Sequence, residues 1–92
     1  MKNSRVVVTV VGKDKVGIIA AVTGVLAEAG ANILDISQTI MRDFFTMIMI
    51  VDIANINTDY STVVEKLGKV GKELGVQIAA QNEEVFNYMH RI

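Results

Sequence analysis

The chain has 92 residues with no cysteine and no proline, and its nine basic and ten acidic residues give a formal net charge of −1. A chain of this length forms one domain, here predicted as a core over about residues 5–82 with a tail over residues 83–92. The lack of cysteine excludes disulfides and thiol catalysis, and the near-neutral charge favours neither nucleic acid nor an anionic membrane as a partner. No apolar run approaches the roughly 18 residues that a membrane span needs, so we expect a cytoplasmic protein.

The first half of the chain predicts a strand, a helix and a hairpin. Residues 5–12 are short and valine-rich, as in a buried strand. Residues 18–29 predict an amphipathic helix, with Asp14 as its N-cap and Gly30 as its C-terminal stop. Residues 32–41 and 44–53 alternate in polarity around Arg42-Asp43, which predicts two antiparallel strands joined by a tight turn.

The second half predicts a helix, a strand and a helical tail. The helix is capped near Thr58 or Asp59 and ends at Gly75, and residues 76–82 form the fourth strand. Residues 83–92 carry apolar side chains at helical spacing. The resulting order, β-α-β-β-α-β, predicts an α+β, ferredoxin-like fold. In that fold two helices cover one face of a four-stranded antiparallel sheet whose first and third strands are central.

One face of the predicted sheet has no helix over it. We place the fully apolar side of the third strand under the helices, and we interpret the methionines at positions 41, 47 and 49 as core filler. The opposite face then has an apolar centre and a polar rim, which is typical of an interface core. We expect a second copy of the chain, the C-terminal tail, or both to cover it. The side chains at its centre are Val7, Thr9, Val11, Thr46, Ile48 and Ile50.

The glycine spacing of Gly12 and Gly17 matches the first half of a phosphate-binding loop. Such a loop needs a lysine and a hydroxyl residue directly after its second glycine, and here Ile18 and Ile19 occupy those positions. The single histidine, His90, lies in the tail, and no histidine–carboxylate pairing is evident from spacing. The sequence therefore predicts neither a nucleotide site nor an enzyme, and it indicates no metal and no cofactor.

Several segments resemble a known family. From Val6 to about Asn82 the chain resembles an ACT domain, a regulatory fold that binds amino acids and other small effectors. The pattern lies in "GKDKVGIIAAVTGVLAEAGANILDISQT", which has a D-x-x-G turn, a helix and a polar-alternating strand. The segments "VGKDKVGI", "NILDISQTI", "FFTMIMIVD" and "MHRI" are similar to those of the stand-alone ACT proteins of the UPF0237 family.

The resemblance implies a ligand site at a homodimer interface, beside the loop after the first strand. Carried onto this chain, the effector-binding residues are Asp14, Lys15, Val16, Gly17 and Asn32. A helix N-terminus suits a carboxylate, and an aspartate at position 14 favours the ammonium of an amino acid. The resemblance thus implies a homodimeric regulatory protein that senses an amino acid or similar zwitterion and signals to a partner protein. The alternative is a protein–protein interaction module without a small ligand.

Overall fold

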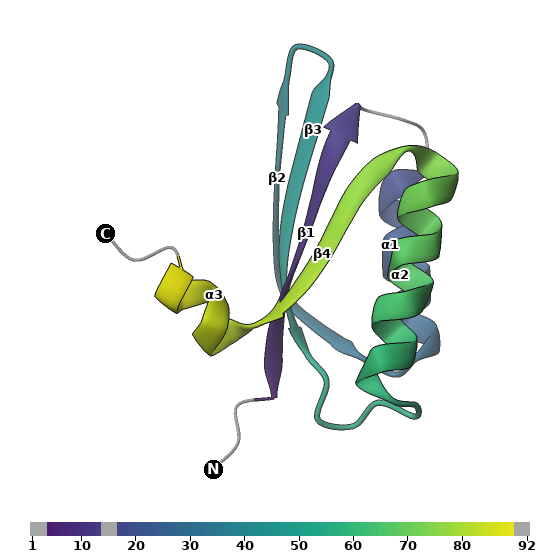
Figure 1. Cartoon of the computed structure of the whole chain (residues 1–92), viewed down its shortest axis with the longest axis vertical. Coiled ribbons are helices and arrows are strands. Elements are labelled where there is room, and N and C mark those ends of the chain that lie inside the picture. Colours follow the sequence, from purple (N-terminus) through teal and green to yellow (C-terminus); the bar gives the residue numbers. More distant parts are fainter. Residues whose placement is uncertain (1–3, 14–16, 90–92) are drawn as a thin grey trace.

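The structure of the chain, a computed structural model, describes residues 4–13 and 17–89 (Figure 1). The elements are β1 (Arg5–Lys13), α1 (Ile18–Glu28), β2 (Asn32–Met41), β3 (Phe44–Asp52), α2 (Tyr60–Leu74), β4 (Val76–Asn82) and α3 (Glu83–Met89). This order confirms the predicted β-α-β-β-α-β arrangement with a helical tail. The interpretations of Asp14, Lys15, Val16 and His90 concern positions outside the described residues.

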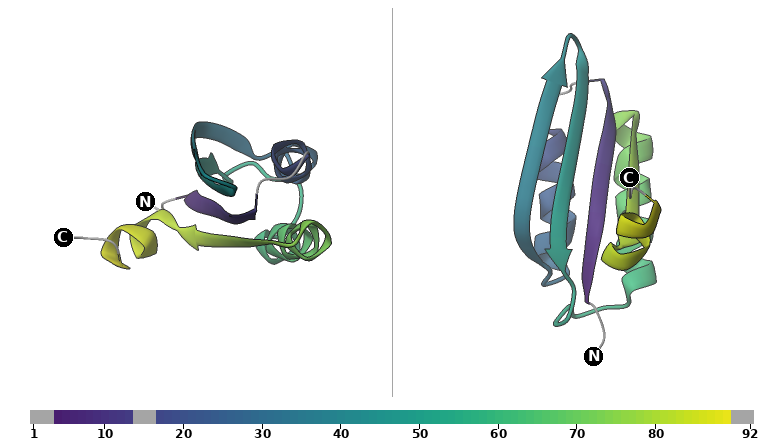
Figure 2. Two further views of the ribbon diagram at one scale, coloured as in Figure 1. Left: turned by 90° about the horizontal axis from the view of Figure 1, so that it is seen from above. Right: turned by 90° about the vertical axis from the view of Figure 1, so that its left-hand side faces the viewer.

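The four strands form one antiparallel sheet in the order β2-β3-β1-β4, so β1 and β3 are central as predicted. Both long helices cover the same face of this sheet, α1 behind β2 and β3 and α2 behind β1 and β4 (Figure 2). The short helix α3 lies on the opposite side and contacts β1 and β4. The sheet therefore has one fully covered face and one open face.

The core lies between the sheet and the two long helices. Strand alternation directs every second residue of β1 and β3 toward the helices, where an apolar layer excludes water. The helices contribute the apolar stripes that their spacing predicts. The buried side chains of this layer include Val8, Val10, Met47, Met49, Val51, Ile18, Val22, Leu26, Val63 and Leu67.

The N-cap of α1 differs from the prediction, although the helix starts where it was expected. The helix begins at Ile18, and the N-cap position is occupied by Gly17 rather than by Asp14. Gly17 has a φ of 92°, in the left-handed region that glycine adopts without steric cost. The predicted cap was wrong because the helix begins at Ile18, and the N-cap is the residue directly before it. Asp14 is four residues upstream of Ile18, too far to occupy that position.

The helix ends follow the glycine signals of the sequence. Gly30 has a φ of 81° and donates its N–H to the Ala27 carbonyl at 3.0 Å, while the Ala31 N–H reaches the Leu26 carbonyl at 2.9 Å. These two bonds form a Schellman motif, which satisfies carbonyls that the helix leaves unpaired. In α2 the predicted stop is confirmed as well, because Gly75 is the C-cap with a φ of 72°.

The open face of the sheet is covered at one end only. Val7 points to this face but is 2% exposed, and it lies outside the core cluster beneath the long helices. Four residues further along the same strand and face, Val11 is 44% exposed. Because α3 contacts β1 and β4 on this side, the tail covers the end at Val7 and leaves the end at Val11 uncovered.

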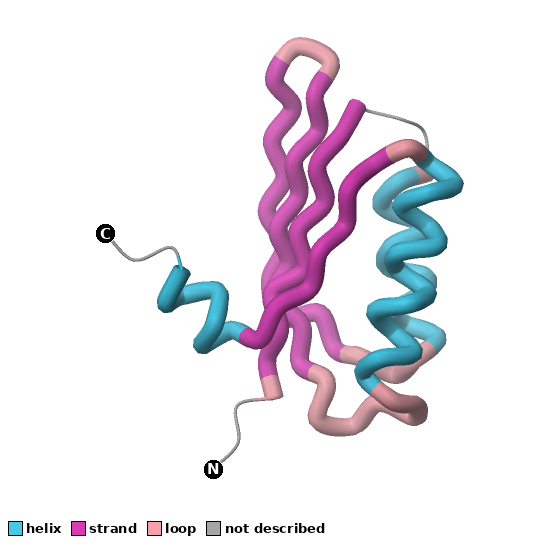
Figure 3. Tube along the Cα trace, in the orientation of Figure 1, coloured by secondary structure: helices cyan, strands magenta, loops and turns pink. Residues whose placement is uncertain are grey.

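The β2–β3 hairpin extends past the ends of both long helices (Figure 3). Its two-residue turn is Arg42-Asp43, as predicted, and Arg42 has a φ of 59°. Met47 and Met49 lie in the core, but Met41 is 70% exposed beside this turn. The interpretation of Met41 as core filler was therefore wrong, because Met41 pairs with Phe44 on the face of the sheet opposite the helices.

Candidate functional site

The start of α1 provides free backbone donors next to a residue without a side chain. Gly17 is exposed, and the Ala21 N–H donates the first helical bond to the Gly17 carbonyl at 2.9 Å. The first three helical N–H groups therefore have no carbonyl within the helix to bind. None of the first-turn residues is acidic, so no helical carboxylate offsets the partial positive charge of this end. A small anion would find complementary charge here.

Asn32 begins β2 at the other end of the molecule. It is exposed and lies opposite Asp52 in the β2–β3 register. Its amide can donate and accept hydrogen bonds, and within residues 4–13 and 17–86 no partner for its side chain is found. Asn32 is therefore available to a ligand, but its position is far from Gly17.

A single chain does not bring Gly17 and Asn32 together. The helix between them has 11 residues, which corresponds to about 16 Å of rise along its axis. Helix α1 begins at the end of the sheet where β1 finishes, and Asn32 starts β2 at the opposite end, as the chain path shows (Figure 1). The two described residues of the predicted site thus stand at opposite ends of one helix.

Lys13 lies at the same end of the sheet as Gly17. Its Nζ is 3.6 Å from Asp43 Oδ2 across the end of the hairpin, and both side chains are largely exposed. Such an exposed pair contributes little stability, since solvent screens it. The pair places a cation at the end of the sheet where α1 begins, on the face opposite the helices.

Strand β2 is an unpaired edge of the sheet. All of its residues except Ile33 are exposed, and the strand pairs only with β3. Long exposed edges attract further strands, and proteins usually protect them with lysine or proline. β2 contains neither, and its protection is limited to one register shift between Ile33 and Asp35 and one charge at Asp35. The edge is chemically suited to pair with another strand.

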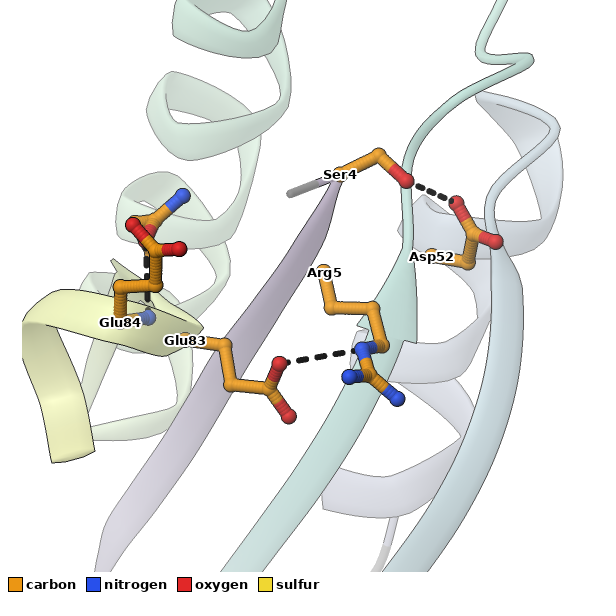
Figure 4. A network of polar contacts seen from close by, with 6 residues as sticks. Ser4, Arg5, Asp52, Glu83 and Glu84 are labelled. Carbon is orange, nitrogen blue, oxygen red and sulfur yellow. Dashed lines mark hydrogen bonds and ion pairs between the residues drawn. The ribbon is translucent and has the colours of Figure 1, made fainter. Parts of the chain in front are cut away.

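A polar network fixes the end of the sheet that carries Asn32 (Figure 4). Asp52 Oδ1 accepts hydrogen bonds from the Ser4 hydroxyl at 3.0 Å and from the Ala54 N–H at 2.9 Å. The Ala54 N–H, the Ser4 hydroxyl and the nearby Arg5 charge all stabilise the carboxylate, so they lower the pKa of Asp52. On the other side of β1, Arg5 Nε is 3.0 Å from Glu83 Oε1, which ties α3 to the sheet.

Other surface features of the described residues carry less chemistry. A shallow depression beside β4 is lined mainly by small and apolar residues, with Thr9, Lys72 and Gln77 as its polar members, and it contains neither Gly17 nor Asn32. Within the described ranges, no group of three or more histidine, aspartate or glutamate residues could hold a metal ion. None of the helices in that part of the chain has the length and apolar character required to cross a membrane.

Comparison with known proteins gives one consistent family. An ACT domain model matches residues 4–81. A UPF0237 protein of Methanocaldococcus jannaschii is 58% identical over 89 residues, which is 97% of this chain and 99% of that protein. Among solved structures, an ACT domain protein from Streptococcus pneumoniae is 40% identical with a TM-score of 0.75, covering 89% of this chain and 92% of that one.

A further solved structure has been assigned as a glycine cleavage system transcriptional repressor. It is 28% identical to this chain with a TM-score of 0.69, and the match covers 84% of this chain but 44% of the longer one. The family and these neighbours together support a regulatory role in general for the chain.

Proposed function

Since the chain belongs to the ACT domain family and is one of the UPF0237 proteins, we propose that it is a regulatory, non-catalytic sensor of a small molecule. Its ligand is an amino acid or a similar zwitterion, bound at the interface of a homodimer. The ligand-bound dimer passes its state to a partner protein. The observation that carries this proposal is the placement of Gly17 and Asn32 at opposite ends of α1, on a chain whose β2 edge is free.

Pairing of two β2 edges would bring Gly17 of one chain and Asn32 of the other to the same end of the joined sheet. If β2 pairs antiparallel with β2 of a second copy over its full length, the partner's Asn32 lies opposite Met41. Met41 is at the hairpin end of the sheet, in register with Phe44 and, through it, with Lys13. Helix α1 begins at this same end (Figure 1). A two-fold axis therefore brings a helix N-terminus of one chain and the Asn32 amide of the other to the same end of the paired sheet, in two equivalent copies.

The two ends of a zwitterion have different partners in such a site. The ligand carboxylate binds the free N–H groups of the first turn of α1, where the helix dipole favours negative charge. The amide oxygen of the partner's Asn32 and the carboxylate of Asp14 accept hydrogen bonds from the ligand ammonium. The resemblance assigns Lys15 and Val16, which precede Gly17 in the sequence, to the same site. The absence of a side chain at Gly17 permits close approach to the backbone.

Thermal unfolding with each common amino acid tests the proposal. A ligand that binds only the folded chain stabilises it by about 2.7 kcal/mol at a hundredfold excess over Kd, which raises Tm by several degrees. We expect one amino acid, or a close group, to give this shift. A flat panel, with the protein still self-associated, would instead favour the alternative of an interaction module without a small ligand, for which the exposed apolar side chains of the open face would be the surface.

A further inference from the structure

The open face of the sheet has two diagonally opposite corners of different chemistry. One corner carries α3, which stands out from the sheet beside the lower ends of β1 and β4 (Figure 2). The other corner is the hairpin end, where four side chains of the open face form what we call the tip patch. The tip patch consists of Val11, Lys13, Met41 and Phe44.

The tip patch is the least covered apolar surface on this face. Phe44 is 55% exposed and Met41 is 70% exposed, although both lie on the same side of the sheet as the buried Val7. A contiguous group of solvent-exposed apolar side chains is typical of an interaction site. Ile48 at the centre of the face is 38% exposed, so the apolar exposure is greatest at the corner that α3 does not reach. The patch therefore lacks a covering element that the other corner has.

Helix α3 offers a matching surface. Val85 is 49% exposed on it, so among the described side chains part of the apolar side of α3 remains open to solvent. Its first turn is acidic, with Glu83 bound to Arg5 and Glu84 exposed. In the part of the chain with described side chains, Glu84 forms no ion pair.

The charges of the two corners are complementary. Lys13 of the tip patch is paired with Asp43 of the hairpin turn, whereas Arg42 in that turn has no ion-pair partner among the described side chains, so these three groups leave a net positive charge. An acidic, partly apolar helix and an apolar patch with a cationic border attract one another. They cannot meet within one chain, because the sheet separates them diagonally.

We propose that the open face binds the open face of a second copy, with α3 of each chain packed on the tip patch of the other. A two-fold axis along the remaining diagonal of the face exchanges the two corners, so one arrangement forms both contacts at once. Ile48 and Thr9, at the centre of the face, then lie across the axis from their counterparts. The contact needs no ligand and leaves the β2 edges free, so it is separate from the proposed function.

Charge reversal tests the contact, with oligomeric mass measured by sedimentation equilibrium over a range of concentrations. The experiment uses the full chain carrying Ile36→Lys, which places like charges near the centre of any β2–β2 pairing and so prevents it. In this background we expect a dimer. Glu84→Lys or Arg42→Asp should each raise the dissociation constant at least tenfold, because each puts like charges at both contacts. Aspartate is chosen at position 42 because it tolerates a positive φ.

Two further samples separate the contact from a general effect of charge. The Glu84→Lys and Arg42→Asp chains, mixed in equal amounts, should form a heterodimer close to the original affinity, since opposite charges then meet at both corners. Glu65→Lys, an equivalent change on the exposed side of α2, should leave the dissociation constant unchanged.

The possible outcomes are distinct. A concentration-independent monomer in the Ile36→Lys background would overturn the face-to-face contact, and so would a dimer that neither reversal weakens. Failure of the proposed β2 pairing would look different, since the chains with and without Ile36→Lys would then have the same mass. Circular dichroism of each variant verifies that the fold is retained.

Discussion

Gly17 and Asn32 lie at opposite ends of α1, with the 11 residues of that helix between them. One chain therefore cannot wrap both around a ligand the size of an amino acid. Two chains joined through their β2 edges can, because an antiparallel pair places the start of one strand beside the end of the other. This relationship makes the proposed site a property of the dimer, and it determines what substitutions at either residue should do.

Asn32→Ala should abolish the thermal shift given by the stabilising amino acid. The side chain is exposed and has no partner among the described residues, so the unliganded Tm should change little. Asn55→Ala, at another exposed asparagine in the loop before α2, serves as the matched control and should keep the shift. Loss of stability without ligand in Asn32→Ala would instead indicate a structural role.

The Asp52 network predicts a pH dependence of stability. Because the pKa of Asp52 is lowered in the folded chain, its contribution to stability is fully present above the pKa of the unfolded chain. That contribution is lost as the pH falls through the folded value. Ser4→Ala removes one of the two hydrogen bonds, so the pKa of Asp52 should rise toward its ordinary value. A carboxyl titration by NMR measures this, and an unchanged pKa in Ser4→Ala would contradict it.

Gly68 and Gly71 should respond in opposite ways to alanine. A Cβ at Gly71 would lie 2.8 Å from the Val76 carbonyl oxygen, whereas a Cβ at Gly68 has no neighbour within 4 Å. We expect Gly71→Ala to destabilise the fold by about 1–3 kcal/mol, since backbone must shift. Gly68→Ala should stabilise it by about 0.5–1 kcal/mol through helix propensity. Urea unfolding compares the two, and equal effects would refute the close packing of α2 on β4.

Met41 and Met47 form a second matched pair. Met47 is fully buried at the centre of the sheet, and Met41 is exposed at the end of the hairpin. Met47→Ala should cost about 2–5 kcal/mol of unfolding free energy, from lost burial and the cavity left behind. Met41→Ala, measured at a concentration where the chain does not self-associate, should fall within about 0.5 kcal/mol of the parent. A large loss at Met41 would mean that the hairpin is covered within the single chain.

The element order, the central strands and the glycine stops could be predicted because local signals carry them. Strands and helices have different hydrophobic periods, so the valine-rich β1 can be told from the apolar stripes of α1 and α2. Gly30 and Gly75 have backbone conformations that other residues rarely adopt, which marks the helix ends. Those signals depend on near neighbours in the sequence, so no tertiary knowledge was required. Gly17 was missed as the N-cap of α1 because Asp14 is of a residue type that N-caps favour.

The spatial relations between elements that are distant in the sequence could not be predicted from local residue patterns. The exposure of Met41 depends on its place on the open face, at the hairpin end that α3 does not reach. The burial of Val7 by α3 depends on where the tail turns after β4. The separation of Gly17 from Asn32 follows from the chain path as well. The residue pattern predicted which groups could bind a zwitterion. Only the structure showed that Gly17 and Asn32 lie at opposite ends of the sheet.

Complementation between two inactive chains tests the shared site most directly. Asn32→Ala removes the amide from one chain, and Gly17→Val blocks the start of α1 in the other. Neither variant alone should bind the stabilising amino acid. In an equal mixture that exchanges subunits, half of the dimers pair one chain of each kind, and each of these has one intact site.

Isothermal titration of that mixture should therefore recover about a quarter of the binding capacity of the parent chain. The affinity of these sites should equal that of the parent, since each intact site contains both unaltered contributions. If the ligand bound within a single chain, the mixture would have no more capacity than its two components. A titration with no recovered sites, from a mixture shown to exchange subunits, would contradict the interface site.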